Sequence, residues 1–154
     1  MTLSEEVKNR ITEILGSQEF MSNLYEGLSE AQRKKLGMVY TPASICIQMI
    51  ESFDCDSLAN KTILDPACGS GNLLIACLIA GADTDKLYGN EYDKVAVDLC
   101  RRRINRACAL LGKQQIQDWQ IHHGDATQAR CLTDFSPSYR YQEYEQVDLF
   151  SNFF

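Results

Sequence analysis

The chain has 154 residues, of which 45% are hydrophobic and 23% are charged, and this is enough for a single compact unit with one ordinary core. No run approaches the apolar length of a membrane span, and the acidic start lacks the basic, apolar pattern of a signal sequence, so we expect a cytoplasmic protein. The net charge of −6 argues against a free-standing DNA-binding protein, which usually shows a basic face.

The first part of the chain predicts helices. Residues 3–15 and 17–28 have helical patterns. Ser29 followed by Gln32 has the pattern of a capping box, which opens a third helix. We therefore expect an N-terminal helical cap over residues 1–36.

From residue 37 to residue 154 we expect one α/β domain. Its first helix has Thr41 and Pro42 as N-cap and first helical residue. The predicted elements are helices over 42–53, 73–80 and 93–111, strands over 61–63, 86–91, 119–126 and 146–150, and a loop over 134–145. Strands that alternate with helices in this way predict a parallel sheet with right-handed crossovers.

A glycine-rich loop joins the first predicted strand to the next helix. Residues 64–72 read Leu-Asp-Pro-Ala-Cys-Gly-Ser-Gly-Asn. Gly69 and Gly71 lack the Cβ atoms that would block a ligand, and the helix start offers free N–H groups to a carboxylate or phosphate. Asp65 follows the strand, at the edge where open α/β sheets bind ligands. The alternative is a plain strand-to-helix turn.

Two more carboxylates follow predicted strands. Glu91 lies about 20 positions after Gly71, where a carboxylate can accept both hydroxyls of a ribose. The alternative for Glu91 is a solvated loop acid. Asp125 closes the third strand, and its residue type fits either a ligand contact or a helix N-cap.

Other polar and sulfur groups predict structural roles. We interpret Arg101, Arg102, Arg103 and Arg106 as the solvated outer face of a helix, so tight DNA binding needs another polypeptide. The seven cysteines form no Cys-x-x-Cys pair and are expected to be reduced core residues. The two adjacent histidines point to opposite faces of a strand, so no metal site is predicted.

The glycine loop and the segment before it resemble the S-adenosylmethionine-dependent adenine-N6 DNA methyltransferases of restriction-modification systems. Residues 65–71 match the cofactor loop of that family letter for letter, and residues 37–42 resemble its Gly-x-x-Tyr/Phe-Thr-Pro element. The resemblance covers about residues 37 to 152. It implies a Rossmann-like methyltransferase sheet, with strand order 3-2-1-4 in the part present, and S-adenosylmethionine as cofactor.

The resemblance also implies roles for individual residues. Tyr40 and Thr41 would contact the methionine end of the cofactor, Glu91 its ribose, Tyr92 its adenine ring and Asp125 the adenine amino group. The complete implied cofactor set is Tyr40, Thr41, Asp65, Pro66, Ala67, Cys68, Gly69, Gly71, Asn72, Glu91, Tyr92, Asp125 and Ala126.

The chain departs from the family at its last residues. The family carries Asn-Pro-Pro-Tyr or Asn-Pro-Pro-Phe after the fourth strand, whereas residues 151–154 here read Ser-Asn-Phe-Phe. Asn152 is the candidate catalytic residue of this degenerate motif, and an unstructured terminus is the alternative. The further strands that the family adds beside strand 146–150 are not present in these residues, so this strand would lie at an open edge of the sheet. A second copy of the chain or a complementing subunit could cover that edge.

Three functions follow from these observations. The first is the cofactor-binding part of an adenine-N6 DNA methyltransferase that is incomplete without a partner, through which it would meet DNA. The second is a non-catalytic cofactor-binding or regulatory relative of a restriction-modification subunit. The third is a nicotinamide-dependent oxidoreductase, which the absence of a third glycine after Gly71 disfavours.

Overall fold

A computed structural model of the chain describes residues 1–17, 27–38 and 41–128. Three parallel strands form its sheet in the order β1-β2-β3: β1 is Ile63–Asp65, β2 is Leu87–Glu91 and β3 is Ile121–His123. Asp65 lies beside Gly89, and Gly89 beside Ile121, so the carboxyl ends of all three strands meet at one edge.

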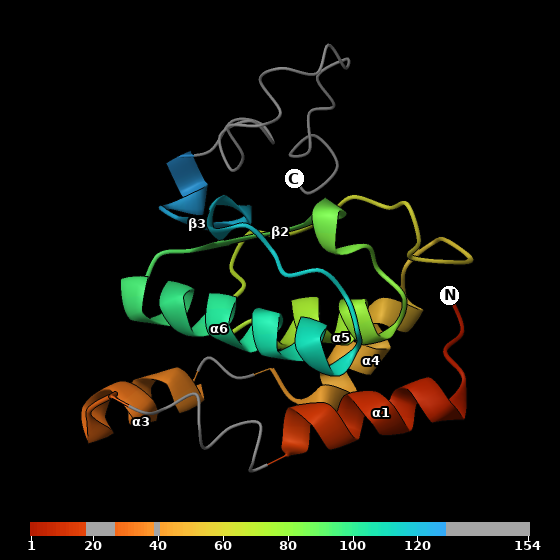
Figure 1. The fold of residues 1–154 in the computed structure, drawn as a ribbon, viewed down its shortest axis with the longest axis horizontal. Coiled ribbons are helices and arrows are strands. Elements are labelled where there is room, and N and C mark those ends of the chain that lie inside the picture. The colour runs from red at the N-terminus through yellow and green to blue at the C-terminus, as the bar shows by residue number, and fades with distance from the viewer. Residues whose placement is uncertain (18–26, 39–40, 129–154) are drawn as a thin grey trace.

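Helices cover one face of this sheet in two layers (Figure 1). The crossover helices α5 (Asn72–Ile79) and α6 (Lys94–Leu110) pack against the strands. Beyond them, α1 (Glu5–Gly16) and α4 (Ala43–Glu51) pack on each other and on α5. This order places the hydrophobic core between sheet and helices.

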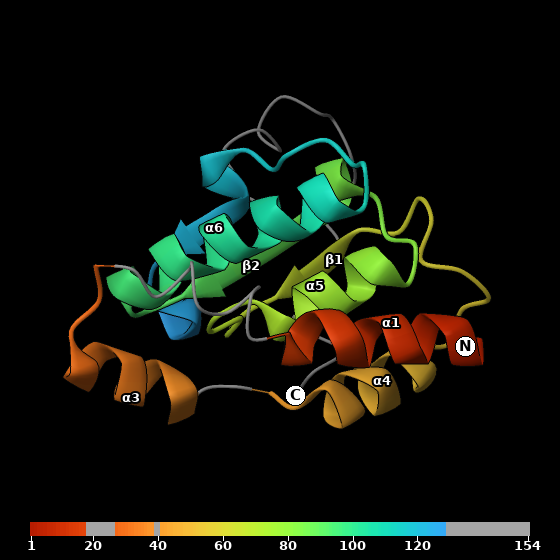
Figure 2. The same cartoon turned by 60° about the horizontal axis from the view of Figure 1, so that its bottom comes forward.

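Helix α3 (Glu30–Met38) lies apart from this stack, beside the N-terminal end of α6 (Figure 2). Three short 3-10 turns complete the described elements, namely η1 (Thr84–Lys86), η2 (Asp118–Gln120) and η3 (Ala126–Gln128). None of the helices within the described ranges is long and apolar enough to cross a membrane.

The patterns of the crossover helices explain their burial. Helix α5 is apolar almost all round and lies between the sheet and the α1–α4 layer, whereas α6 buries only one stripe. The largest fully buried apolar side chains are Ile11, Ile50, Leu58, Leu74, Ile75, Leu78, Leu87, Leu99, Ile104 and Ile121. All of them belong to one cluster, so α1 and α4 share the core of the sheet and its crossover helices.

The capping box predicted at the start of the third helix is confirmed. The Ser29 N–H donates to Gln32 Oε1 at 2.8 Å, and the Gln32 N–H donates to Ser29 Oγ at 3.2 Å. The prediction that Pro42 is the first helical residue is wrong by one position. Pro42 has φ −59° and ψ 150°, so it is the N-cap of α4, and its carbonyl accepts from Ile45 and Cys46.

The third strand is shorter than the predicted range 119–126. Residues 118–120 form η2, because the buried Gln120 amide donates to Thr84 O at 2.7 Å and Leu87 O at 2.8 Å. After β3 the chain turns at Gly124 and enters η3. These side-chain contacts come from distant residues, which strand periodicity does not report.

Several predictions fall on residues outside the described ranges. These include most of the predicted helix 17–28, the loop 134–145, the strand 146–150, and the site residues Tyr40 and Asn152. The three described strands agree with the 3-2-1 part of the predicted order. The fourth strand, and with it the open edge, stays a prediction, as do the N-terminal cap and the division of the chain at residue 36.

Candidate functional site

Polar side chains converge where the three strands end. Asp65 is the last residue of β1 and Glu91 the last residue of β2, and Asp125 follows β3 by two positions. The loop 66–71 leaves β1 at this edge and leads directly into α5. Parallel strands with crossover helices on one face create such an edge, and ligands bind there in open α/β sheets.

Glu91 joins the glycine loop to the start of α6. Its Oε2 accepts a hydrogen bond from the Gly69 N–H at 2.9 Å, and its Oε1 accepts from the Asp93 N–H at 3.0 Å. A carboxylate offers about four acceptor positions, so Glu91 keeps capacity for two more donors. Glu91, which we predicted to contact a ligand, therefore also has a structural role in the site.

Asn90 is a site residue that sequence analysis missed. Its side chain is buried, and Nδ2 donates to Pro66 O at 3.1 Å and to Gly124 O at 3.0 Å. Its Oδ1 lies 2.8 Å from His122 Nδ1, so that ring nitrogen carries the proton. Asn90 thereby ties the turns after β1 and β3 to β2. A polar residue in the interior of an otherwise buried strand was the signal available in the sequence.

The structure corrects the reason given for Gly71. This residue has φ +88°, which favours glycine, and a Cβ placed there would lie 2.7 Å from Cys100 Sγ and 3.5 Å from Ile104 Cγ1. The missing Cβ thus makes room for α6 and not for a ligand. Cys100 Sγ also lies 3.8 Å from Cys68 Sγ, so the two thiols pack between the loop and α6. The hydrogen bond with the Cys100 thiol, together with burial, raises the pKa of the Cys68 thiol, as expected of a packing residue.

The interpretation of the arginine cluster as a solvated face is wrong for Arg103. Its side chain is fully buried under the glycine loop, and Nη1 donates to Ser70 O at 2.8 Å. Arg102 and Arg106 are exposed, as predicted, and Arg101 is half-buried. Arg103 follows Cys100 by three positions and precedes Ala107 by four, a spacing that belongs to the apolar stripe of α6 and could have revealed it.

The first turn of α5 has no side-chain cap. Its N-cap is Gly71, which has no side chain to satisfy the helix N–H groups. The Asn72 amide donates to Thr41 O at 2.8 Å, which connects this turn to the start of α4. Asn72 Oδ1 and Ser70 Oγ are buried, and within the described part of the chain they have no hydrogen-bond partner. Buried polar atoms are normally satisfied, so these two fit a polar ligand at this position.

The carboxylates at the other strand ends make local turns. Asp65 Oδ1 accepts from the Ala67 N–H at 3.1 Å, and burial raises the pKa of the Asp65 carboxyl. Asp125 Oδ1 accepts from Thr127 Oγ1 at 2.6 Å and from the Thr127 N–H at 2.9 Å. These two bonds lower the pKa of Asp125. Of the two predicted roles for Asp125, a ligand contact or a helix N-cap, the structure shows the capping contact. Ala126 is the first residue of η3.

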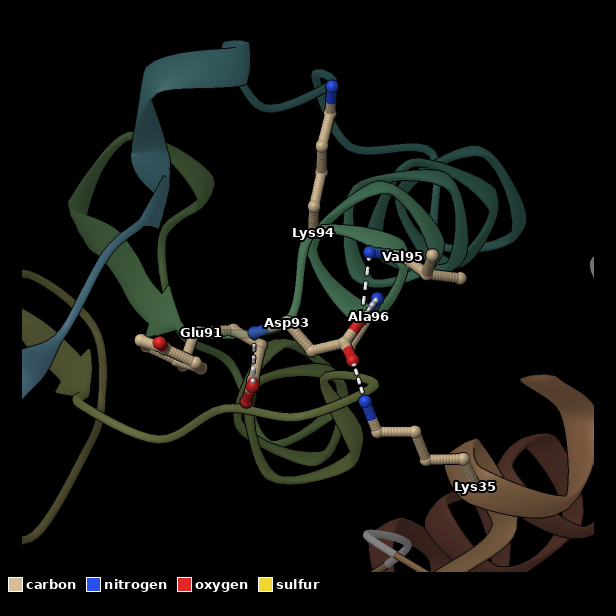
Figure 3. Close-up of a pocket in the computed structure, with 7 residues that line it drawn as sticks. Lys35, Glu91, Asp93, Lys94, Val95 and Ala96 are labelled. Atoms are coloured by element: carbon tan, nitrogen blue, oxygen red, sulfur yellow. Dashed lines mark hydrogen bonds and ion pairs between the residues drawn. The ribbon is translucent and has the colours of Figure 1, made fainter. Parts of the chain in front are cut away.

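A pocket of about 450 Å³ lies beside Glu91, at the start of α6 (Figure 3). Tyr92 borders it and is 75% exposed, while Lys35 reaches it from α3 and forms an ion pair with Asp93. Lys35 lowers the pKa of Asp93, whose Oδ1 also accepts from two N–H groups of the first turn of α6. Lys94 points away from this ion pair. No local sequence signal linked Lys35 to the site.

The model of the N-6 DNA Methylase family matches residues 16–138. The chain belongs to this family. This N-6 DNA methylase chain is similar to the Type II methyltransferase M.VspI of Vibrio sp. strain 343, with 34% identity over 111 residues. That match covers 70% of this chain and 26% of the relative, so the chain spans about a quarter of its length.

The N-6 DNA methylase chain also resembles ribosomal protein L11 methyltransferases over a shorter stretch. The protein from Escherichia coli strain 55989 is 40% identical over 63 residues, and that from Marinomonas sp. is 38% identical over 63 residues. Each match covers 41% of this chain and 20% of the relative. No solved structure matches significantly.

Most of the predicted site residues that the structure describes lie together. Thr41, the loop 65–71, Asn72 and Glu91 are linked by the hydrogen bonds given above, and the Tyr92 carbonyl accepts from His123 Nε2 at 2.9 Å. Asp125 and Ala126 lie at the end of the neighbouring strand. Tyr40 and Asn152 are outside the described residues.

Proposed function

We propose that this chain is the S-adenosylmethionine-binding part of an adenine-N6 DNA methyltransferase. The observation that carries the proposal is the bond between Glu91 and the Gly69 N–H, at 2.9 Å. It places a carboxylate that could accept from ribose hydroxyls beside the uncapped first turn of α5, so that one site could bind both ends of a nucleoside that carries an amino acid. Membership of the N-6 DNA methylase family and the similarity to M.VspI support the same cofactor.

Each polar end of the cofactor has a matching group in this chain. The methionine carboxylate would accept from the N–H groups of the first α5 turn. The methionine ammonium would donate to Asn72 Oδ1, which is buried and has no donor among the described residues. Glu91 would accept from the ribose hydroxyls with its remaining acceptor positions. Tyr92, which is largely exposed, would pack on the adenine ring, and the second oxygen of Asp125 would accept from the adenine amino group.

The cofactor supplies a methyl group on a sulfonium for transfer to a nitrogen lone pair. The residues of this chain contribute position and charge, and no covalent nucleophile is needed. Cys68 is buried, and its raised pKa disfavours the thiolate. We further propose that this chain contacts DNA only together with additional polypeptide, such as a partner chain. Its net charge is −6, and Arg103 of its one dense arginine cluster in the sequence is buried.

Calorimetric titration tests this proposal directly. Wild-type protein should bind S-adenosylmethionine at one site and should give no binding heat with NAD. Tyr92→Ala should weaken binding of S-adenosylmethionine by about 5- to 150-fold, since stacking on a base contributes about 1–3 kcal/mol. Arg102→Ala, at an exposed position on α6, is the matched control and should bind like wild type. Absence of S-adenosylmethionine binding, or equal binding of NAD, would overturn the proposal.

A further inference from the structure

Arg103 is an ionised group placed inside the core, directly below the glycine loop. Its side chain is 0% exposed and is the largest fully buried side chain among the described residues. Guanidinium stays protonated in proteins, so burial here keeps a full positive charge out of water. Such burial is unfavourable unless the charge is used in interactions, and hydrogen bonding within the protein offsets part of this cost here.

The position of this charge is specific. Arg103 Nη1 donates to Ser70 O at 2.8 Å, and Ser70 is followed by Gly71, the N-cap of α5. The first turn of α5, which has no side-chain cap, already carries partial positive charge on its N–H groups. The guanidinium therefore adds positive potential close to the same turn. A low-dielectric surrounding screens this potential much less than water does.

From this geometry we infer that Arg103 is a positioning residue that makes the α5 N-terminus selective for a ligand bearing a carboxylate. The inference rests on the proposed function, because it assigns the amino-acid end of the cofactor to this turn. The guanidinium holds the Ser70 carbonyl, and with it the peptide that leads into the helix, and its charge favours an anion at the first turn. The nucleoside end lies at Glu91 and gains nothing from Arg103.

A purely structural role would behave differently. If Arg103 only attached α6 to the loop, its loss would disturb the whole site and weaken every ligand of the site alike. If its charge acts on a carboxylate, the loss is confined to ligands that carry one. Two ligands that share the nucleoside and differ in the amino-acid end separate these cases. S-adenosylhomocysteine carries the carboxylate, and 5′-methylthioadenosine lacks the amino-acid group.

The test is calorimetric titration of both ligands against wild type, Arg103→Gln, Arg103→Lys and the exposed control Arg102→Gln. Arg103→Gln should bind S-adenosylhomocysteine about tenfold more weakly and 5′-methylthioadenosine within about twofold of wild type. Arg103→Lys keeps the charge and should retain the wild-type ratio of the two affinities within about threefold. Arg102→Gln should change neither ligand.

The outcomes separate the two proposals. Equal weakening of both ligands in Arg103→Gln, or no weakening of either, would overturn the role of Arg103 while leaving the cofactor site intact. If Arg103→Gln does not fold, as thermal melting would report, Arg103→Lys decides alone, and loss of the affinity ratio in that folded variant would overturn the inference. Failure of wild type to bind either ligand would overturn the proposed function and this inference with it.

Discussion

Replacement of Gly71 by alanine should destabilise the protein far more than the same replacement of Gly81. Both residues have left-handed backbone angles, with φ +88° at Gly71 and φ +105° at Gly81. Around Gly81 no described residue has an atom within 4 Å of an added Cβ, whereas at Gly71 the Cβ would lie 2.7 Å from Cys100 Sγ. Gly81 is therefore a control that carries the backbone strain without the steric contact.

The magnitudes follow from these two contributions. A non-glycine residue in a sparsely populated backbone region costs about 1–3 kcal/mol, and this applies to both positions. Overpacking of a close-packed interior costs about another 1–3 kcal/mol, and this applies only at Gly71. We therefore expect Gly71→Ala to lose about 2–6 kcal/mol of unfolding free energy, and Gly81→Ala about 1–3 kcal/mol. The sulfur atom of Cys100 should account for most of the difference.

Urea unfolding followed by circular dichroism measures these losses in single variants and in a double-mutant cycle with Cys100→Ala. Removal of Sγ should recover part of the Gly71→Ala loss, with a favourable coupling of about 1–2 kcal/mol, and should leave the Gly81→Ala loss unchanged. Equal losses at the two glycines, or a coupling of zero with Cys100→Ala, would refute the packing of α6 against the loop.

Three further predictions concern charge and burial. Asp65→Asn should raise the melting temperature at pH 7, because burial raises the pKa of this carboxyl and so disfavours its charged form in the folded state. The gain in melting temperature should vanish below pH 3.8, the ordinary pKa, and a gain that persists there would contradict this prediction. Burial raises the pKa of Cys77 to about 12, so iodoacetamide at pH 8 should label half-buried Cys55 well before Cys77. Peptide mass spectrometry measures this order, and equal labelling rates of the two thiols without urea would count against it. Asp93→Ala removes the N-cap of α6 and should lower the free energy of unfolding in urea by about 1 kcal/mol, whereas Lys35→Ala keeps the cap and should lower it by less. Equal losses in the two variants would assign the stabilisation to the ion pair.

The features that depend on local spacing could be predicted from the sequence. The strand–loop–helix unit around residues 64–72, the carboxylate at Glu91 and the capping box at Ser29 all rest on residues close together in the chain. Backbone geometry and helix periodicity act over a few residues, so their signals survive without tertiary information. Element ends were less certain, as β3 and the start of α4 show, because side chains from elsewhere in the chain take part in ending them.

The supports of the site could be found only in the tertiary structure. The bond from Arg103 to Ser70 spans 33 positions, that from Asn90 to Gly124 spans 34, and the Lys35–Asp93 pair spans 58. The parallel crossovers bring these residues together, and periodicity along one element cannot report which distant groups it will meet. The sequence by itself therefore determined that a glycine turn, a helix start and a carboxylate occur at the spacing of a nucleoside site. Only tertiary packing decided that a Cβ added at Gly71 would contact α6 and that Arg103 lies beneath the loop. Both features depend on contacts between elements far apart in the chain.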